Sequence, residues 1–225
     1  MHEWFPRNIS TYGADVDGVF FLVYWIVGVW FVLAQGALLY LIVRFRRRPG
    51  QPARYIAGDS WKQLAWVLVP ALLVIVLDFG IDTASARVWE RIKTYRPAGD
   101  VRMQLEAKQF EWLFLYPGPD GEPGNGDDFE INGELRVPVG KDIRITMRSK
   151  DVLHSFFLPN VRLKQDVVPG RAIDVWFQVT ETGTYEIGCA ELCGFGHYNM
   201  KGSFVVQTQE EYDAWVAQQS AKAHS

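Results

Sequence analysis

The chain has 225 residues, of which 48% are hydrophobic, and its 23 basic and 26 acidic side chains leave a net charge of −3. This charge gives no reason to expect nucleic acid as a partner, and two cysteines are too few for a disulfide-rich scaffold or for paired Cys-x-x-Cys zinc sites. The averages hide a strong separation of hydrophobic and polar residues along the chain.

A long uncharged segment near the start predicts a membrane-spanning helix. Residues 18–43 carry no charge, and Gln35 is the one strongly polar side chain among them. As a helix this run would be about 39 Å long, more than the roughly 30 Å hydrocarbon layer requires. Residues 1–17 lack the basic start and the small-residue cleavage site of a secretory signal. We therefore expect an extracytoplasmic tail followed by a retained membrane anchor.

A second apolar run predicts a second span. Residues 63–77 are uncharged, and the run reaches the length of a span when it is taken as residues 61–81. Because its strictly uncharged part is short, a buried helix of a globular core is the alternative. Pairing with the first run favours a transmembrane helical hairpin over residues 18–82.

The loop between the two spans, residues 44–60, is basic and predicts the orientation of the hairpin. Its one acid is Asp59, whereas its basic residues are Arg44, Arg46, Arg47, Arg48 and Arg54. Positively charged loops stay in the cytoplasm, so we expect both termini on the other side of the membrane.

The rest of the chain predicts a β-domain. We expect a linker at residues 83–100, a domain at 101–207, and a C-terminal helix and tail at 208–225 that open with a capping box, Thr208 to Glu211. Short strands separated by Gly, Pro, Asn or Asp turns argue for an all-β Greek-key sandwich or barrel. The expected strands are 101–107, 110–116, 135–139, 143–148, 173–179, 184–188 and 202–207.

Both cysteines lie in one glycine-rich loop of this domain, beside a histidine and a methionine. Cys189, Cys193, His197 and Met200 follow one another at intervals of four, four and three residues. Thiolate, imidazole and thioether ligands together favour copper over hard cations. A Cys189–Cys193 disulfide is the alternative in an oxidising compartment, but it would close a very short loop and leave the other two side chains without a role.

His154 offers a second imidazole upstream of this loop. A lone histidine in an apolar strand is commonly a core residue, but here a cysteine-containing loop offers a site for it. A single blue copper site uses two His, one Cys and a weak axial Met, so this sequence has one thiolate to spare. Two thiolates can bridge two copper ions.

The motif Gly188-Cys-x-Glu-x-Cys-Gly-x-Gly-His-x-x-Met200, preceded by Asp151-Val-Leu-His-Ser-Phe156, resembles subunit II of haem-copper cytochrome c oxidases. The resemblance covers nearly the whole chain and implies a cupredoxin-like fold for the β-domain. It implies the subunit through which electrons enter a terminal oxidase, from cytochrome c to a binuclear copper centre and on to haem. Oxygen reduction to water and proton translocation then belong to the complex, because this chain carries no haem motif.

The same resemblance implies the roles of the site residues. The implied copper ligands are His154, Cys189, Glu191, Cys193, His197 and Met200. The two thiolates would bridge two copper ions, each histidine would bind one ion, and the axial positions would be filled by the methionine and by the backbone carbonyl of Glu191. The Glu191 side chain would also bind a magnesium ion at the interface with the catalytic subunit.

Two positions depart from the family pattern. Phe110 stands where an electron-accepting tryptophan is usual, so electrons are expected to arrive through Trp112, Tyr116 or Phe110. Simple alternation of core and surface residues along a strand is the other interpretation of Phe110 and Trp112. In the second span, Gln63 occupies the position of a family glutamate near a proton path, and a glutamine does not exchange protons at neutral pH.

Acidic side chains suggest where a basic cytochrome c could dock. Asp127, Asp128 and Glu130 lie in a segment without basic residues, whereas Asp151 follows Lys150, which would weaken an acidic face there. Such charge could steer the donor, with rates that fall as salt rises. The glycines in this segment also fit a plain solvated hairpin loop.

Other copper proteins fit the sequence less well. A tethered mononuclear cupredoxin leaves one cysteine unexplained, a copper chaperone usually lacks this arrangement, a quinol oxidase subunit II lacks the ligands, and nitrous oxide reductase is a much longer chain.

The expected cofactors are two copper ions and a shared magnesium ion. The expected partners are oxidase subunits I and III, a cytochrome c or cytochrome c domain, and membrane lipid. We expect a bacterial cytoplasmic membrane, with the copper domain on its periplasmic side.

Overall fold

The computed structural model describes residues 5–52 and 55–223, which form two compact units. One unit is a helical hairpin within residues 15–90. The other is a β-domain that combines the described part of the N-terminal tail with the chain from Arg91 onward.

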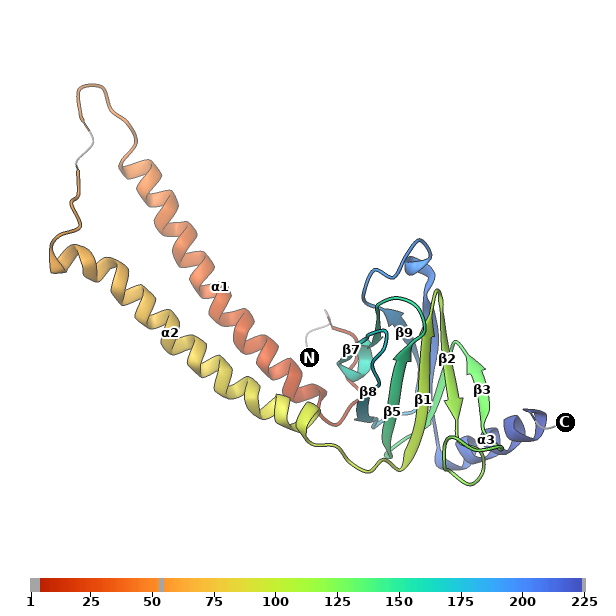
Figure 1. Cartoon of the computed structure of the whole chain (residues 1–225). Coiled ribbons are helices and arrows are strands. Elements are labelled where there is room, and N and C mark those ends of the chain that lie inside the picture. The colour runs from red at the N-terminus through yellow and green to blue at the C-terminus, as the bar shows by residue number, and fades with distance from the viewer. Residues whose placement is uncertain (1–4, 53–54, 224–225) are drawn as a thin grey trace. The chain divides into compact units, whose positions relative to one another are not determined.

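The hairpin consists of two long apolar helices joined by the basic loop (Figure 1). Helix α1 spans Gly13–Arg44 and helix α2 spans Trp61–Trp89, followed by a π-helical turn at Glu90–Thr94. The most apolar 18-residue window has a mean hydropathy of 2.3 in α1 and 2.5 in the helical segment that begins with α2. No residue of either window is buried within the structure. Both are long and apolar enough to cross a membrane, and the second run is not a core helix of the β-domain.

The helices are longer than the expected spans. Helix α1 begins five residues earlier, with Asp15 in its first turn, where a carboxylate interacts favourably with the helix dipole. Helix α2 continues eight residues past residue 81, because the residues that follow contain neither glycine nor proline. The segment that leaves the hairpin is therefore largely helical.

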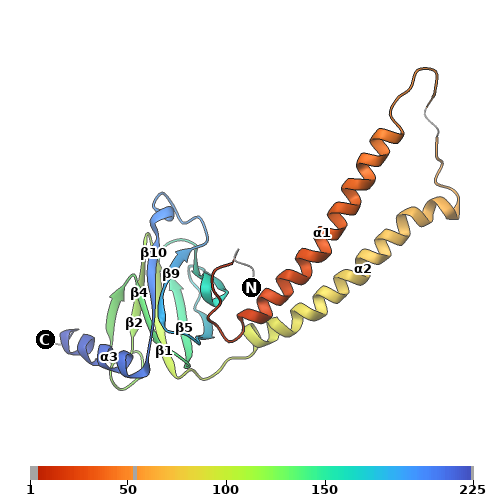
Figure 2. The same cartoon turned by 180° about the vertical axis from the view of Figure 1, so that it is seen from behind.

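The β-domain is a sandwich with a short C-terminal helix, as the sequence predicts, but its two five-stranded sheets contain three strands more than the seven expected (Figures 1 and 2). One sheet has the order β3-β2-β1-β5-β8 and the other β4-β10-β9-β6-β7. The pairs β1/β5 and β4/β10 are parallel, and the other neighbours are antiparallel. The bounds are β1 Val101–Lys108, β2 Glu111–Tyr116, β3 Phe129–Asn132, β4 Glu134–Pro138, β5 Asp142–Ser149, β6 His154–Leu158, β7 Leu163–Val167, β8 Ile173–Gln178, β9 Gly183–Cys189, β10 Lys201–Gln207 and α3 Gln209–Ala223.

Alternating side chains fill the space between the sheets. On β1, Met103, Leu105 and Ala107 are buried while their neighbours are not, which is the period of two that a half-buried strand requires. Aromatic rings join the two layers edge to face: Phe177 of β8 lies 5.8 Å from Phe204 of β10, between ring centres. The core thus holds both sheets in a fixed relation.

The described part of the N-terminal tail belongs to the β-domain. Ile9 and Tyr12 have exposed fractions of 0%. The Ile9 amide donates to the Asn160 carbonyl at 2.9 Å, the Ile9 carbonyl accepts from the Thr180 amide at 2.8 Å, and Ser10 forms an antiparallel bridge with Val179. The tail therefore covers the edge of the sheet beyond β8.

Helix α3 closes the end of the domain beside β3 and β4. Its capping box is present, since the Glu211 amide donates to the Thr208 hydroxyl at 3.3 Å and the Thr208 amide donates to the Glu211 carboxylate at 3.0 Å. Trp215 packs edge to face on Tyr116, with 4.9 Å between ring centres. This end of the sandwich is filled by aromatic packing.

Candidate metal centre

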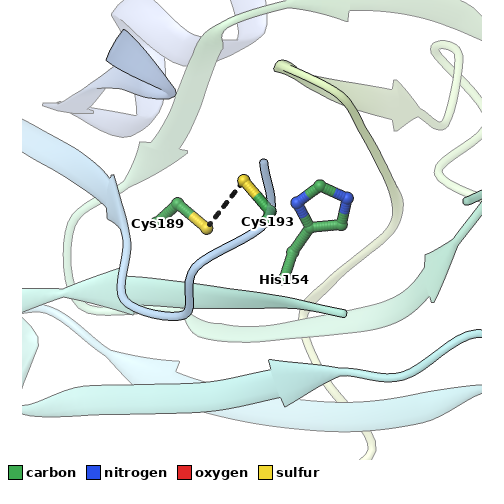
Figure 3. Close-up of side chains that lie close together, drawn as sticks. All are labelled: His154, Cys189 and Cys193. Carbon is green, nitrogen blue, oxygen red and sulfur yellow. Dashed lines mark hydrogen bonds between the residues drawn. The ribbon is translucent and has the colours of Figure 1, made fainter. Parts of the chain in front are cut away.

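The metal-binding side chains come from two neighbouring strands and one loop. His154 is the first residue of β6 and Cys189 the last of β9, and these strands pair with Phe156 opposite Cys189. Cys193 lies in the loop that follows β9. Because the paired strands fix their ends next to each other, the imidazole and both thiols face the same space, as Figure 3 shows.

The two cysteines lie close together without a bond between them. Their sulfur atoms are 3.9 Å apart, and both thiols are free in the described chain. A disulfide needs an S–S distance near 2.05 Å, so the alternative of a Cys189–Cys193 disulfide is absent from this structure. The nearest ligand atoms of His154, Cys189 and Cys193 all lie within 4.8 Å of one another.

The remaining predicted copper ligands surround this pair of thiols. Cys193 Sγ lies 3.7 Å from His197 Nδ1 and 3.6 Å from Met200 Sδ. Cys189 Sγ lies 3.2 Å from the backbone carbonyl oxygen of Glu191. The structure therefore brings together all six donors that the family resemblance implies.

Burial makes the free thiol of Cys193 a weak acid. Burial and the adjacent Cys189 raise the pKa of Cys193 to about 11. A thiol with that pKa is protonated at neutral pH, whereas a bound metal ion displaces the proton and stabilises the thiolate. The pair of sulfurs is therefore chemically suited to a soft metal ion and costly to ionise without one.

The His154 ring supplies the test of whether the site fits a metal. It is fully buried, and its Nε2 lies 2.8 Å from Asp151 Oδ1. A carboxylate accepts hydrogen bonds, so Nε2 carries the proton and Nδ1 keeps a free lone pair. Among the described residues, His154 Nδ1 is a buried atom without a hydrogen-bond partner. In Figure 3 one ring nitrogen is turned toward Cys193. An unpaired buried nitrogen beside two sulfurs fits a copper ligand set.

Asp151 connects this ring to the surrounding backbone. Its carboxylate also accepts from the amides of Gln109, at 2.7 Å, and Val152, at 2.6 Å. Partial burial raises the pKa of Asp151, but the hydrogen bonds from His154, Gln109 and Val152 outweigh it and hold the pKa below its ordinary value. Of the four docking candidates, Asp151 is thus the one in contact with the metal centre.

The other docking candidates lie before and within β3. Asp128 Oδ2 accepts from the Gly124 amide at 2.6 Å, and the Asp127 amide donates to Asn125 Oδ1 at 3.1 Å. Glu130 lies on β3 with its side chain exposed. Asp127 and Asp128 therefore belong to an internally hydrogen-bonded loop, whereas Glu130 projects from the strand that follows it.

Of the three aromatic candidates for electron uptake, two are core residues. Trp112 and Tyr116 have exposed fractions of 0%, whereas Phe110 is half-buried. The Trp112 ring lies 6.1 Å from the His154 ring, between centres, and Tyr116 packs at the α3 end of the sandwich. A donor protein could therefore touch Phe110 but could not touch Trp112 or Tyr116 directly.

Lys164 holds the Glu191 side chain, a contact that the sequence did not predict. Lys164 Nζ lies 3.0 Å from Glu191 Oε1 and 3.1 Å from Asp166 Oδ1. Hydrogen bonds to these two carboxylates raise the pKa of Lys164. The contact links β7 to the metal loop, and 27 residues separate its partners in sequence.

Gln63 lies in the first turn of α2, in the other unit of the chain. Its Oε1 accepts from the Gly58 amide at 2.8 Å, and its own amide lies 3.4 Å from the Ser60 hydroxyl that caps the helix. The side chain therefore stabilises the start of α2, and the proton-path role remains a prediction.

Comparisons with known proteins agree with this geometry. The family model described as "Cytochrome C oxidase subunit II, periplasmic domain" matches residues 102–208. "Alternative cytochrome c oxidase subunit 2" of Bradyrhizobium diazoefficiens is 31% identical over 98% of this chain and 86% of the relative. "Cytochrome c oxidase subunit 2" of Synechocystis sp. is 30% identical over 96% of this chain and 76% of the relative. Among solved structures, the periplasmic domain of subunit II of cytochrome oxidase from Bradyrhizobium japonicum is 30% identical, with a TM-score of 0.51 over 56% of this chain and 97% of that domain.

Proposed function

Since this chain belongs to the cytochrome c oxidase subunit II family, whose members are subunits of an oxidoreductase complex, we propose that it accepts electrons from a cytochrome c at a binuclear copper centre. It then delivers them to haem in the catalytic subunit. Copper is implied by the family, and the proposal extends this to two ions per chain.

The observation that carries the proposal is the gathering of four further donors, two imidazoles, a thioether and a backbone carbonyl, around two free thiols. His154 Nδ1, with no described hydrogen-bond partner, lies beside the sulfurs, and Cys193 Sγ lies within 3.7 Å of both His197 Nδ1 and Met200 Sδ. One-electron transfer is the chemistry that two thiolate-bridged copper ions would supply. A site for a single blue copper would leave one thiolate without a role.

The protein's own contribution is to keep the ligands in place. His154 and Cys189 lie at the ends of paired strands, and Trp112 packs against the His154 ring. Ligands held by a rigid sheet change position little when the charge of the centre changes, which favours fast electron transfer. The free thiols need only lose their protons to bind.

Glu191 supports a second, shared metal in the proposal. The backbone carbonyl oxygen of Glu191 lies 3.2 Å from Cys189 Sγ. Lys164 forms an ion pair with the Glu191 carboxylate, which is partly exposed. We assign this carboxylate as the chain's ligand for magnesium, with the remaining ligands from the catalytic subunit. A magnesium ion prefers oxygen ligands and is usually held by one or two carboxylates while it keeps several waters.

The proposal also covers the partners and the location of the chain. We place both helices in a bacterial cytoplasmic membrane, beside subunits I and III, with the basic loop inside and the β-domain in the periplasm. The charge of the loop supports this orientation, and the relatives named above are bacterial subunits. Electrons then arrive from a cytochrome c or cytochrome c domain outside the membrane.

The proposal is tested on the assembled oxidase with both thiols replaced, Cys189→Ser and Cys193→Ser. We expect reduced cytochrome c to lose its ability to reduce the haem of the complex in a stopped-flow experiment. A small chemical reductant that reaches the haem directly should still reduce it, which shows that the complex is intact. Undiminished haem reduction by cytochrome c in the assembled double variant would overturn the proposal.

A further inference from the structure

We propose that Gln109 is a positioning residue of the metal centre, which ties its two ligand-bearing segments together. The inference rests on the proposed function, since it concerns how the same site is held. Gln109 lies in the turn between β1 and β2, far in sequence from both segments.

The side chain of Gln109 holds the metal loop. Its Nε2 donates to the backbone carbonyl of Cys193 at 2.6 Å. That carbonyl belongs to the peptide that joins Cys193 to Gly194, whose φ of +138° turns the chain toward His197. Fixing this peptide plane fixes the direction from which the Cys193 side chain leaves the backbone, and therefore the position of its sulfur.

The main chain of Gln109 holds the other segment. Its amide donates to Asp151 Oδ2 at 2.7 Å, and Asp151 Oδ1 lies 2.8 Å from His154 Nε2. A hydrogen bond at the outer nitrogen of a ligating histidine fixes the orientation and the tautomer of the ring. One residue thus contacts the Cys193 loop directly and His154 through a single carboxylate.

The next residue strengthens the same support. A Cβ placed on Gly196 would lie 2.5 Å from Phe110 Cδ2, and one on Gly194 would lie 3.3 Å from the same ring. The backbone of the metal loop therefore lies directly on the Phe110 ring. The β1–β2 turn supports the loop by a hydrogen bond at Cys193 and by packing at the two glycines.

The two arms of Gln109 can be separated by mutation. Gln109→Met keeps the length of the side chain and the backbone amide but removes the donor to Cys193. Gln104→Met is the matched control, because Gln104 lies on the outer face of neighbouring β1 and its side-chain amide makes no hydrogen bond to another described residue. Gln109→Glu tests the same arm independently, since a carboxylate cannot donate to a carbonyl.

The test uses the full chain in detergent, loaded with copper. We expect Gln109→Met and Gln109→Glu to bind as much copper as the wild type but to lose it to a chelator roughly 10-fold faster, the lower end of the effect of groups that orient metal ligands. Their electron paramagnetic resonance hyperfine pattern should change, while Gln104→Met matches the wild type. Melting of the metal-free chain identifies any variant that fails to fold.

The outcomes separate the two proposals. Wild-type copper release and an unchanged hyperfine pattern in a folded Gln109→Met or Gln109→Glu chain would overturn the positioning role. Faster release in the Gln104→Met control as well would overturn it too, because the effect would then be general to the sheet. A wild-type chain that does not hold two copper ions would instead contradict the proposed function.

Discussion

At the scale of single residues, His154 shows how the protein prepares a metal ligand before any metal binds. The Asp151 carboxylate fixes one ring nitrogen and Trp112 packs against the ring, so the other nitrogen is left facing the thiols. A buried nitrogen without a partner lowers stability, and a bound cation would remove that penalty. The metal-free chain is therefore less stable than it would be with this nitrogen paired, but the ligand is already in place when a metal ion binds.

Gly196 shows a second requirement at this scale, close approach of the backbone to the Phe110 ring. We predict that Gly196→Ala destabilises the metal-free chain by about 1–3 kcal/mol, because the added methyl group would lie 2.5 Å from Phe110 Cδ2 and overlap the ring. Chemical denaturation followed by near-ultraviolet circular dichroism measures the effect. Gly126→Ala is the control, since a Cβ there meets nothing within 4 Å.

A double-mutant cycle identifies the cause. In the Phe110→Ala background the Gly196→Ala change should cost much less, because the overlapping ring is gone. If the cost is the same in both backgrounds, the Phe110 ring is not what the glycine accommodates.

Sequence spacing was informative at this scale because metal ligands are constrained in type. The intervals between Cys189, Cys193, His197 and Met200, together with the family resemblance, led to a ligand set that the structure gathers in one place. Lys164 and Gln109 were missed as contacts of the site. Lys164 and Gln109 both lie far in sequence from the residues of the metal loop that they contact. The residues around them give no indication of those partners.

At the scale of elements, the N-terminal tail is a working part of the β-domain. Ile9 is fully buried, and the tail adds a bridge to the chain just beyond β8. We predict that Ile9→Ala destabilises the β-domain by about 2–5 kcal/mol, although Ile9 precedes the first strand by more than 90 residues. The expected cause of the lost stability is the cavity that the shorter side chain would leave beneath the tail.

Urea unfolding of the full chain in detergent, observed through the tertiary signal of the β-domain, tests this prediction. Ile56→Ala serves as the control, because Ile56 is 66% exposed and its loss should change stability by no more than about 0.5 kcal/mol. Equal stabilities of the Ile9 and Ile56 variants would show that the tail does not contribute to the fold.

Element prediction succeeded where the pattern was simple and failed where it was not. The alternation on β1 and the capping box of α3 were readable from the sequence. The strands β3, β6 and β7 were not among those predicted. Strand β6 is buried along almost its whole length and shows no alternation, β3 follows an acidic glycine-rich segment, and β7 carries charged residues. The tail gave no hint of its role, since its burial depends on a surface formed later in the chain.

At the scale of the whole molecule, charge and hydrophobicity divide the chain between two environments. The two apolar helices are long and hydrophobic enough to cross a membrane. The acidic residues before and within β3 are the ones for which we propose a role in docking cytochrome c. We predict that neutralising Asp127, Asp128 and Glu130 together slows oxidation of cytochrome c by the assembled oxidase at low salt, because electrostatic steering raises association rates.

Salt provides the internal control for this prediction. The difference between the triple variant and the wild type should shrink as ionic strength rises, since screening removes the attraction in both. Equal rates at low salt would exclude these acids from docking.

The central claim, that this chain holds a binuclear copper centre, is tested most directly by metal analysis and electron paramagnetic resonance of the purified copper-loaded chain. The geometry of His154, Cys189, Cys193, His197 and Met200 predicts two copper ions per chain that share one unpaired electron. One copper ion per chain with a mononuclear blue spectrum, or a Cys189–Cys193 disulfide in place of metal, would contradict it.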